Sequence, residues 1–232
     1  YDFDIEQVGQ ERKKSNIYKA RVSRVEQSLD AAFVDFGSEK HGFLPIKELH
    51  PGFYKGKNQK APINEILAQG DEIIIQVEKE ERGTKGAAIS TFISLPGHYL
   101  VLMPNSPEAG GISKSIEGKA RDEVRVKLKQ LNIPKEMGLI VRTAGSNKTK
   151  RDIEYDLSSL IETWDKIKEN AMNSMAPALI HQESDIIKRT LRDIYDDDTK
   201  NIIIEGNTGY QKAKNFMKLL MPNNLKKIKK YR

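Results

Sequence analysis

The chain has 232 residues, contains no cysteine and carries a net charge of +6. The lack of cysteine excludes disulfides, thiol chemistry and cysteine-ligated zinc within these residues. No apolar run reaches the roughly 18 residues of a membrane-spanning helix, and no signal-peptide pattern opens the chain, so we expect a cytoplasmic protein. Because the first residue is Tyr1 rather than Met, we expect the chain to be part of a longer protein.

The positive charge lies at the C-terminal end. Residues 1–94 carry a net charge of −1, residues 95–187 a net charge of 0, and residues 188–232 a net charge of +7. A basic balance favours nucleic-acid partners, but here it does not extend over the first two thirds of the chain. Nucleic-acid binding by residues 1–187 must therefore rest on particular side chains.

The first six residues, Tyr1–Glu6, alternate between apolar and acidic side chains, which predicts a half-buried strand. Its acidic face, made of Asp2, Asp4 and Glu6, fits either a metal cluster or the solvated face of a strand. We favour the solvated face.

Residues 16–94 predict a small β-barrel. Five short segments have β-branched or alternating residues and are separated by glycines: Ile17–Val25, Ala31–Phe36, Gly42–Ile46, Asp71–Glu78 and Gly86–Ser94. Five strands in about 80 residues are typical of a closed barrel of the OB type. The longest connection, His50–Gln69, predicts a surface loop with a short helix at Ile63–Ala68.

Residues 95–187 mix strands and helices. Leu95–Met103 is an apolar stretch, Lys119–Leu131 has helical spacing after Gly118, and Gly138–Thr143 predicts a short strand. Asp152–Met175 predicts a long amphipathic helix. Its apolar stripe consists of Ile153, Leu157, Leu160, Ile161, Trp164, Ile167 and Ala171.

The last part of the chain predicts a small α/β layer. Ile186–Tyr195 and Thr208–Met221 have helical spacing, and Ile202–Ile204 reads as a buried strand. Leu225–Arg232 is strand-like and rich in lysine. The β-α-β order of the last three segments is typical of a layered α/β unit.

Sequence blocks in a fixed order run along nearly the whole chain: Asn16–Val22, Ala31–Gly37, His41–Pro45, Glu80–Gly86, Thr91–Ser94, Tyr99–Asn105, Ala109–Ser113, Gly138–Ala144 and Ile180–Ser184. Together these blocks resemble the ribonuclease E/G family, and its E branch more than its G branch. The blocks are distributed along the chain from Asn16 to Ser184.

The resemblance implies an α+β multidomain fold. Residues 12–91 are expected to be an S1-type OB-fold RNA-binding domain, and residues 92–187 an α/β 5′-sensor subdomain. Residues 1–11 and 188–232 are expected to be parts of a truncated RNase H-like subdomain. In such a protein the catalytic subdomain, with its paired aspartates, and the two-cysteine zinc motif follow Arg232, so we expect no catalytic residue and no metal ligand here.

Two phenylalanines and a lysine are the RNA-binding candidates on the barrel. Exposed aromatic rings stack on the bases of single-stranded RNA, and a nearby cation holds the phosphate. From the pattern alone, Phe33 and Phe43 fit barrel core and Lys85 a solvated loop at least as well. The family resemblance instead implies that these three residues contact RNA.

A second candidate site follows the predicted strand Gly138–Thr143. A terminal phosphate needs a guanidinium and a hydroxyl or N–H donor in one pocket. The dipeptide Arg142-Thr143 provides both, although an ordinary surface ion pair is the simpler interpretation of the residues alone. The resemblance implies that Arg142 and Thr143 bind a 5′-monophosphate and that Gly97 and Val101 contact the terminal nucleotide.

Other candidates are weaker. Lys114 and Ser115 stand where the family often has two arginines, so an auxiliary phosphate contact there is in doubt. Asp196–Asp198 fits a solvated acidic loop better than a metal site, because three successive carboxylates do not easily converge on one ion. The four histidines show no metal-ligand spacing, and His41 and His181, which lie inside the matched blocks, are predicted to be structural. The basic run Lys226–Arg232 fits either a nucleic-acid tail or an edge strand with lysines facing water.

The leading hypothesis is the RNA-binding and 5′-monophosphate-sensing part of a bacterial single-strand-specific endoribonuclease that acts in RNA processing and mRNA decay. The resemblance implies Mg²⁺ for catalysis and structural zinc, both bound downstream, and an intact homotetramer with degradosome partners. The intact enzyme is expected in the cytoplasm, with peripheral contact to the inner membrane left open. The alternative is a non-catalytic OB-fold RNA-binding accessory protein.

Overall fold

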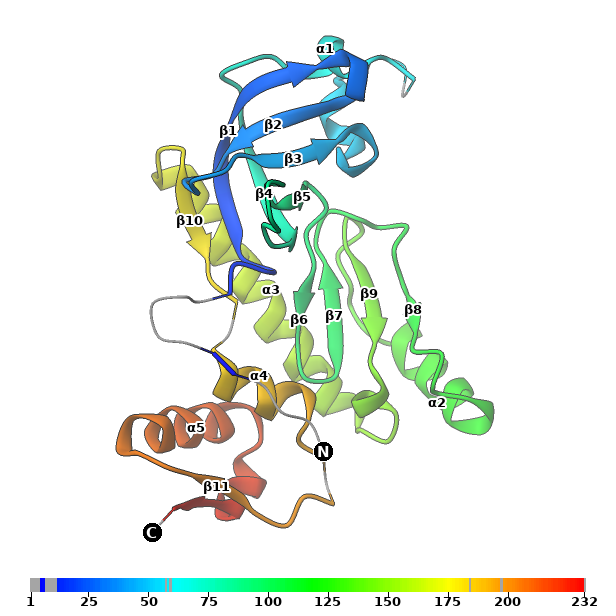
Figure 1. Ribbon diagram of the computed structural model, residues 1–232. Coiled ribbons are helices and arrows are strands. Elements are labelled where there is room, and N and C mark those ends of the chain that lie inside the picture. The colour runs from blue at the N-terminus through cyan, green and yellow to red at the C-terminus, as the bar shows by residue number, and fades with distance from the viewer. Residues whose placement is uncertain are drawn as a thin grey trace.

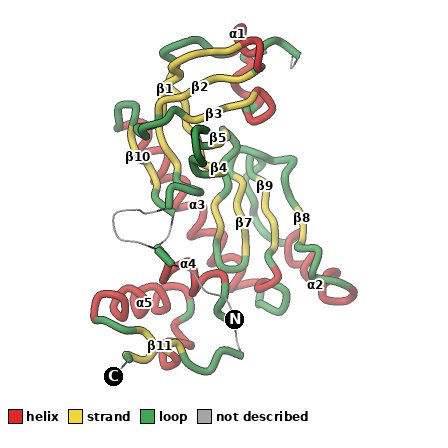
Figure 2. Tube along the Cα trace, viewed as in Figure 1, coloured by secondary structure: helices red, strands yellow, loops and turns green. Residues whose placement is uncertain are grey.

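The computed structural model describes residues 5–6, 12–56, 58, 60–183, 185–196 and 198–231. These residues form a β-barrel, a four-stranded sheet backed by a long helix, and a small α/β unit at the end opposite the barrel (Figure 1 and Figure 2). Within this part of the chain no helix is both long and apolar enough to cross a membrane.

The barrel consists of β1 (Ile17–Glu26), β2 (Ala31–Asp35), β3 (Gly42–Pro45), β4 (Glu72–Lys79) and β5 (Ala88–Ser90). The strands pair in the order β1-β2-β3-β5-β4, and β1 also pairs with β4, which closes the sheet on itself. Alternate side chains fill the core, so the period-two pattern of the sequence has the expected physical cause. The prediction of an OB-type barrel is confirmed.

Three details differ from the prediction around the barrel. The fifth strand is shorter than predicted because Gln76 and Asn105 take the hydrogen bonds of the chain after Ser90. The short helix is α1 (Ile63–Ile66). In the predicted strand Tyr1–Glu6, residues 1–4 lie outside the described residues, and Ile5 and Glu6 are not in a strand.

An additional strand, β10 (Ala178–His181), extends the barrel sheet. It pairs with β1 in antiparallel fashion, with Tyr18 opposite Leu179. Two further hydrogen bonds support this pairing, from Lys19 Nζ to the Ser174 carbonyl (2.9 Å) and from the Glu183 N–H to Asn16 Oδ1 (2.8 Å). The barrel and the following region thus share one sheet, which sequence spacing alone did not predict.

The second sheet contains β6 (Leu95–Pro96), β7 (Leu100–Met103), β8 (Gly111–Ile112) and β9 (Gly138–Val141), in the order β6-β7-β9-β8. The predicted apolar stretch Leu95–Met103 is therefore a hairpin, β6 and β7, joined by the loop Gly97–Tyr99. We call Gly97–Tyr99 the hairpin loop.

Two helices accompany the second sheet, α2 (Gly118–Lys129) and α3 (Lys150–Asn173). Helix α2 begins at Gly118 itself, with Glu117 as its N-cap. Helix α3 begins with a capping box between Thr149 and Asp152, which satisfies N–H groups of its first turn. Its predicted apolar stripe packs against the strands, in one core with Leu100, Leu102, Leu139 and Val141.

The C-terminal unit contains α4 (Ile186–Asp193), β11 (Ile202–Ile204), α5 (Asn207–Leu220) and β12 (Ile228–Lys230). Strands β11 and β12 are parallel, so the predicted β-α-β arrangement is present. The residues Pro222–Lys227 form a 3₁₀ turn, and only Ile228–Lys230 of the predicted last strand is extended. The Glu6 carboxylate accepts a hydrogen bond from the Ile186 N–H at 2.9 Å, the first turn of α4.

Candidate nucleic-acid interface

An aromatic pair stands on the outer face of the barrel. Phe33 on β2 and Phe43 on β3 are directly opposite each other, with ring centroids 5.7 Å apart and ring planes at 63°. Both side chains are half-buried, whereas their strand neighbours Ala32, Val34 and Leu44 are fully buried. The rings are therefore not core residues, and their outer surfaces are accessible to a base.

Cations flank the aromatic pair. The Arg24 guanidinium lies 4.7 Å from the centroid of the Phe33 ring. Lys85 is exposed in a tight turn whose ends pair with each other, Arg82 to Lys85. The turn lies next to β3, because the Phe43 N–H donates to the Ala87 carbonyl at 2.8 Å. We call Phe33, Phe43, Lys85 and Arg24 the barrel surface.

The turn reaches β3 only because residue 86 is glycine. A Cβ at Gly86 would lie 2.0 Å from the His41 carbonyl oxygen. This close backbone approach is a reason for glycine that does not depend on a positive φ. It brings the turn that carries Lys85 against β3, the strand of Phe43.

The second predicted site is built around the hairpin loop. Asp156 on α3 is buried, with 4% of its surface exposed. Its carboxylate accepts hydrogen bonds from the backbone N–H groups of His98 (3.2 Å), Tyr99 (2.9 Å) and Leu100 (3.0 Å). A Cβ at Gly97 would lie 2.6 Å from Asp156 Oδ2, so the loop can close on the carboxylate only with glycine there.

Arg142 lies against the same loop. Its backbone N–H donates to the Tyr99 carbonyl (2.8 Å), and its Nη1 donates to the Gly97 carbonyl (2.6 Å). Its Nη2 donates to Asp193 Oδ1 (2.6 Å), so two of the five N–H groups of the guanidinium are engaged. The side chain remains 25% exposed.

Thr143 and Val101 complete the predicted set. Thr143 is exposed, and its hydroxyl lies 3.0 Å from the Ser113 hydroxyl. Val101 pairs with Ile140 on the sheet face turned away from α3, where both side chains are half-buried. Strand alternation places Arg142 on this same face. Gly97, Val101, Arg142 and Thr143 therefore lie at one end of the β7–β9 pair. We call these four residues the sensor site, after the role that was predicted for them.

Charge around Arg142 is balanced by α4. Arg192 forms two hydrogen bonds with the Asp193 carboxylate, at 3.0 and 2.9 Å, and a third with Glu183 at 2.7 Å. Burial raises the pKa of Asp193, but the hydrogen bonds from Arg192 and Arg142 outweigh burial and hold the pKa below its ordinary value. Asp193 is thus an anion that both arginines share.

Two buried groups under the loop have shifted pKa values. Burial raises the pKa of Asp156, and its three backbone hydrogen bonds only partly offset this effect. Burial lowers the pKa of His98, whose Nδ1 lies 2.8 Å from the Arg192 carbonyl oxygen. Desolvation disfavours the charged form in both cases.

Comparison with known proteins decides the family. A model of the "Ribonuclease E/G family" matches residues 94–232, more than half of the chain, and a model of the "S1 RNA binding domain" matches residues 11–92. The chain belongs to the ribonuclease E/G family.

Individual relatives agree with this assignment. Ribonuclease E of Haemophilus influenzae is 48% identical, and the match covers 100% of this chain and 25% of that protein. Ribonuclease E of Escherichia coli is also 48% identical, and the match covers 100% of this chain and 22% of that protein. Ribonuclease G of Salmonella typhimurium is 32% identical, with 93% of this chain and 45% of that protein covered. The chain spans about a quarter of the length of these ribonuclease E proteins.

Among solved structures, the solution structure of GSP13 from Bacillus subtilis is 26% identical and covers 35% of this chain and 56% of its own, with a TM-score of 0.28. A TM-score this low carries no argument about the fold.

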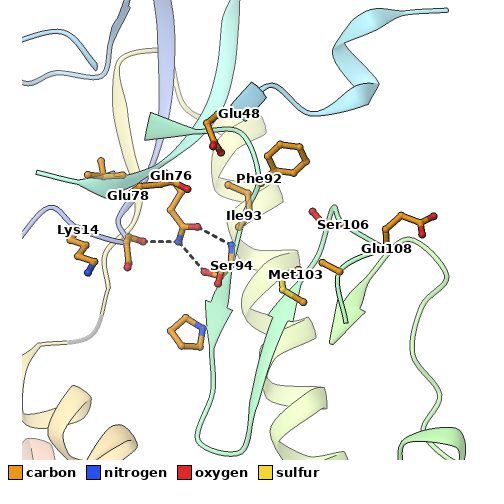
Figure 3. A pocket seen from close by; sticks show the side chains of 14 residues that line it. Lys14, Glu48, Gln76, Glu78, Phe92, Ile93, Ser94, Met103, Ser106 and Glu108 are labelled. Carbon is orange, nitrogen blue, oxygen red and sulfur yellow. Dashed lines mark hydrogen bonds between the residues drawn. The ribbon is translucent and has the colours of Figure 1, made fainter. Parts of the chain in front are cut away.

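A hollow of about 810 Å³ lies where the barrel of this family member meets the second sheet (Figure 3). Its lining includes the carboxylates of Glu48, Glu78 and Glu108, and burial together with Glu48 raises the pKa of Glu78. Three carboxylates disfavour an RNA phosphate. Gln76 on β4 instead binds the segment between β5 and β6. Its Nε2 donates to the Ser94 carbonyl (2.9 Å), and its Oε1 accepts from the Ser94 N–H (2.8 Å).

Among the described residues no three or more histidine, aspartate or glutamate side chains come together in a group that fits a metal ion. In the acidic triplet Asp196–Asp198, residue 197 lies outside the described residues. The Asp196 carboxylate accepts hydrogen bonds from the N–H and the hydroxyl of Thr199. The N-terminal acidic pair Asp2 and Asp4 also lies outside the described residues.

Sequence reasoning missed three residues of the interface. Asp156 had a signal, a carboxylate beside the apolar stripe of a long helix. Arg24 is opposite Phe33 in the pairing of β1 with β2. Sequence reasoning could have found Arg24 only if the register of these two strands had been known. Asp193 had no signal, because it meets Arg142 only through the packing of α4.

Proposed function

We propose that this chain is the RNA-binding and 5′-monophosphate-sensing part of a bacterial single-strand-specific endoribonuclease that acts in RNA processing and mRNA decay. Support comes from the family assignment and from one observation above all. Arg142 and Gly97, 45 residues apart in sequence, are in direct contact at a loop that a buried carboxylate holds in place.

In this proposal the barrel surface binds the RNA strand. Bases stack on Phe33 and Phe43, whose paired rings present two faces at an angle. Lys85 and Arg24 neutralise the phosphates between these bases. Stacking of this kind tolerates any base, because every base has a π-face.

The sensor site reads the 5′ end. A monophosphate takes the guanidinium N–H groups of Arg142 that Gly97 and Asp193 leave unused, together with the Thr143 hydroxyl. The terminal nucleotide lies against Gly97 and Val101. A 5′-hydroxyl end lacks the charge for these hydrogen bonds, so it gains nothing from Arg142.

Cleavage belongs to residues outside this chain. We propose that the intact protein uses Mg²⁺ on a catalytic segment that follows Arg232, carries structural zinc, and assembles as a homotetramer with degradosome partners in the cytoplasm, with peripheral contact to the inner membrane left open. No step proposed for this chain passes through a metal.

The test is fluorescence anisotropy with one short A/U-rich RNA carrying either a 5′-monophosphate or a 5′-hydroxyl. We expect the monophosphate form to bind roughly tenfold more tightly, since hydrogen bonds to charged groups are worth about 1.5–3 kcal/mol. Arg142→Ala should remove this preference. Arg125→Ala, which removes an ion-paired arginine from α2, is the matched control. An equal preference in both variants would refute the sensor role of Arg142.

A further inference from the structure

A cavity beside the sensor site has no role in the function proposed above. It has a volume of about 500 Å³ and lies between the hairpin loop, the first two turns of α3, and the end of α5 with the 3₁₀ turn that follows. This size is within the range of small-ligand sites. None of the predicted site residues lines it. We call it the α3 cavity.

Basic side chains give the α3 cavity its charge. Lys148, Arg151 and Lys218 line it. Arg151 and Lys218 are exposed, and neither has an ion-pair partner among the described residues. The two lining carboxylates are already engaged. Asp156 holds the hairpin loop, and Asp152 accepts from the Thr149 N–H (3.0 Å) and hydroxyl (2.6 Å). With three basic side chains against two carboxylates, the lining carries a net positive charge, which favours an anion.

The rim of the cavity is aromatic and apolar. Tyr155 is 54% exposed and Leu219 is 66% exposed, although both are large side chains. The Tyr155 hydroxyl donates to the Leu219 carbonyl at 3.1 Å, which ties this lining residue of α3 to the end of α5. An exposed ring fixed beside free cations is the combination that binds a nucleotide, with the base on the ring and the phosphate on the cations.

The cavity is close to Arg142. Tyr99 is one of its lining residues, and the Tyr99 carbonyl accepts the Arg142 N–H at 2.8 Å. A strand whose 5′-phosphate is bound by Arg142 would therefore meet the cavity within its first few nucleotides.

We propose that the α3 cavity binds one nucleotide of the same RNA strand, with its phosphate on Arg151 and Lys218 and its base on Tyr155. This proposal rests on RNA being the ligand of the chain, as proposed above, but not on recognition of the 5′-phosphate. The cavity extends the footprint of the RNA across α3 and α5.

The test is photocrosslinking of the 232-residue chain to ten-nucleotide RNAs with 4-thiouridine at one of positions 1 to 6, each made with a 5′-monophosphate and a 5′-hydroxyl. Mass spectrometry then identifies the crosslinked peptides. We expect one position to crosslink to the peptide that contains Tyr155. The absence of this crosslink from every RNA would overturn the proposal.

Two double variants sharpen the result. R151A/K218A should abolish the Tyr155 crosslink and weaken binding of the ten-nucleotide RNA roughly tenfold. K119A/K135A removes the same charge from exposed lysines elsewhere and should retain both. Arg151 and Lys218 have no ion-pair partner to lose within the part of the chain that the structure describes, so we expect unchanged thermal melting. Identical crosslinking by the two double variants would contradict the assignment.

Two further measurements are needed. The first distinguishes a free mononucleotide from a nucleotide of the RNA strand as the occupant of the cavity, and the second distinguishes failure of the sensor proposal from failure of the cavity proposal. If AMP at low concentration removes the Tyr155 crosslink while overall RNA binding is unchanged, the cavity is a site for free mononucleotides and our assignment to the strand is wrong. Failure of the sensor would show as no monophosphate preference, with the crosslink of the 5′-hydroxyl RNA intact. Failure of the cavity proposal would show as no Tyr155 crosslink, with that preference intact.

Discussion

The barrel surface and the sensor site hold their binding residues in different ways. Phe33 and Phe43 stand on neighbouring strands, where the Phe33 ring contacts Phe43 and Arg24, which both belong to the barrel surface. The sensor site instead uses a loop whose shape depends on Asp156, 57 residues away in sequence from Tyr99. We therefore expect binding and stability to be separable on the barrel, whereas at the sensor site one buried residue should support both.

Asp156→Asn is the strongest test of that coupling. The amide replaces an acceptor with a donor, so at least one backbone N–H of the hairpin loop loses its partner and faces another N–H. Leaving buried groups unsatisfied costs about 1–3 kcal/mol each, and we expect a loss of about 3 kcal/mol in the free energy of unfolding. Urea denaturation measures this loss. The folded variant should also lose its preference for 5′-monophosphate RNA.

Asp165→Asn is the control for Asp156→Asn. Asp165 is exposed on the same helix and forms an ion pair with Lys168 at 2.9 Å. Its substitution should change the free energy of unfolding by less than about 0.5 kcal/mol. Equal effects of the two substitutions would mean that Asp156 does not hold the hairpin loop.

The barrel should respond in the opposite way. Phe33→Ala and Phe43→Ala should each weaken RNA binding roughly tenfold, or about 1.4 kcal/mol, because each removes one stacking face. The free energy of unfolding should change much less than it does for Val34→Ala, which opens a cavity in the core. Anisotropy and urea denaturation on the three variants measure both quantities. A large loss of stability in Phe33→Ala would show that the ring is a structural residue after all.

The same contrast explains what sequence alone could predict. Four of the five barrel strands were predicted to within a residue or two, because alternation on a half-buried sheet is a local signal. The amphipathic stripe of α3 was predicted for the same reason. Contacts between distant segments carry no such period. The pairing of β10 with β1, and of Arg142 with Asp193, required the folded chain.

A smaller effect is the pH dependence of the free energy of unfolding, which we expect to come from two histidines, His98 in the hairpin loop and His181 on β10. Burial lowers the pKa values of His98 and His181 below the ordinary value near 6.5. Below that pH the unfolded chain takes up protons that the folded chain does not, so stability falls as the pH is lowered. We expect a loss of about 1 kcal/mol between pH 7.5 and 5.5, measured by urea denaturation at each pH.

His98→Asn assigns the pH effect. The slope of the free energy of unfolding against pH is measured for the wild type and the variant, and the difference between the two slopes is the contribution of His98. Asp156 contributes to both slopes, and its raised pKa increases stability as the pH is lowered, opposite to His98. The slope should be shallower in the variant. An unchanged slope would remove His98 as a source of the pH dependence.

The smallest expected effect separates charge from stacking on the barrel surface. Lys85 is exposed and forms no ion pair among the described residues, so we expect it to contribute an electrostatic contact with a phosphate. Lys85→Ala should weaken RNA binding about twofold at low salt and reduce the slope of log K against log salt by about 0.7. Anisotropy across a salt series measures this slope. Lys60→Ala, an exposed lysine in another loop, should leave it unchanged, and so should Phe33→Ala. If Lys85→Ala weakens binding equally at every salt concentration, Lys85 acts by shaping its turn rather than by its charge, and the barrel surface then depends on loop geometry as the sensor site does.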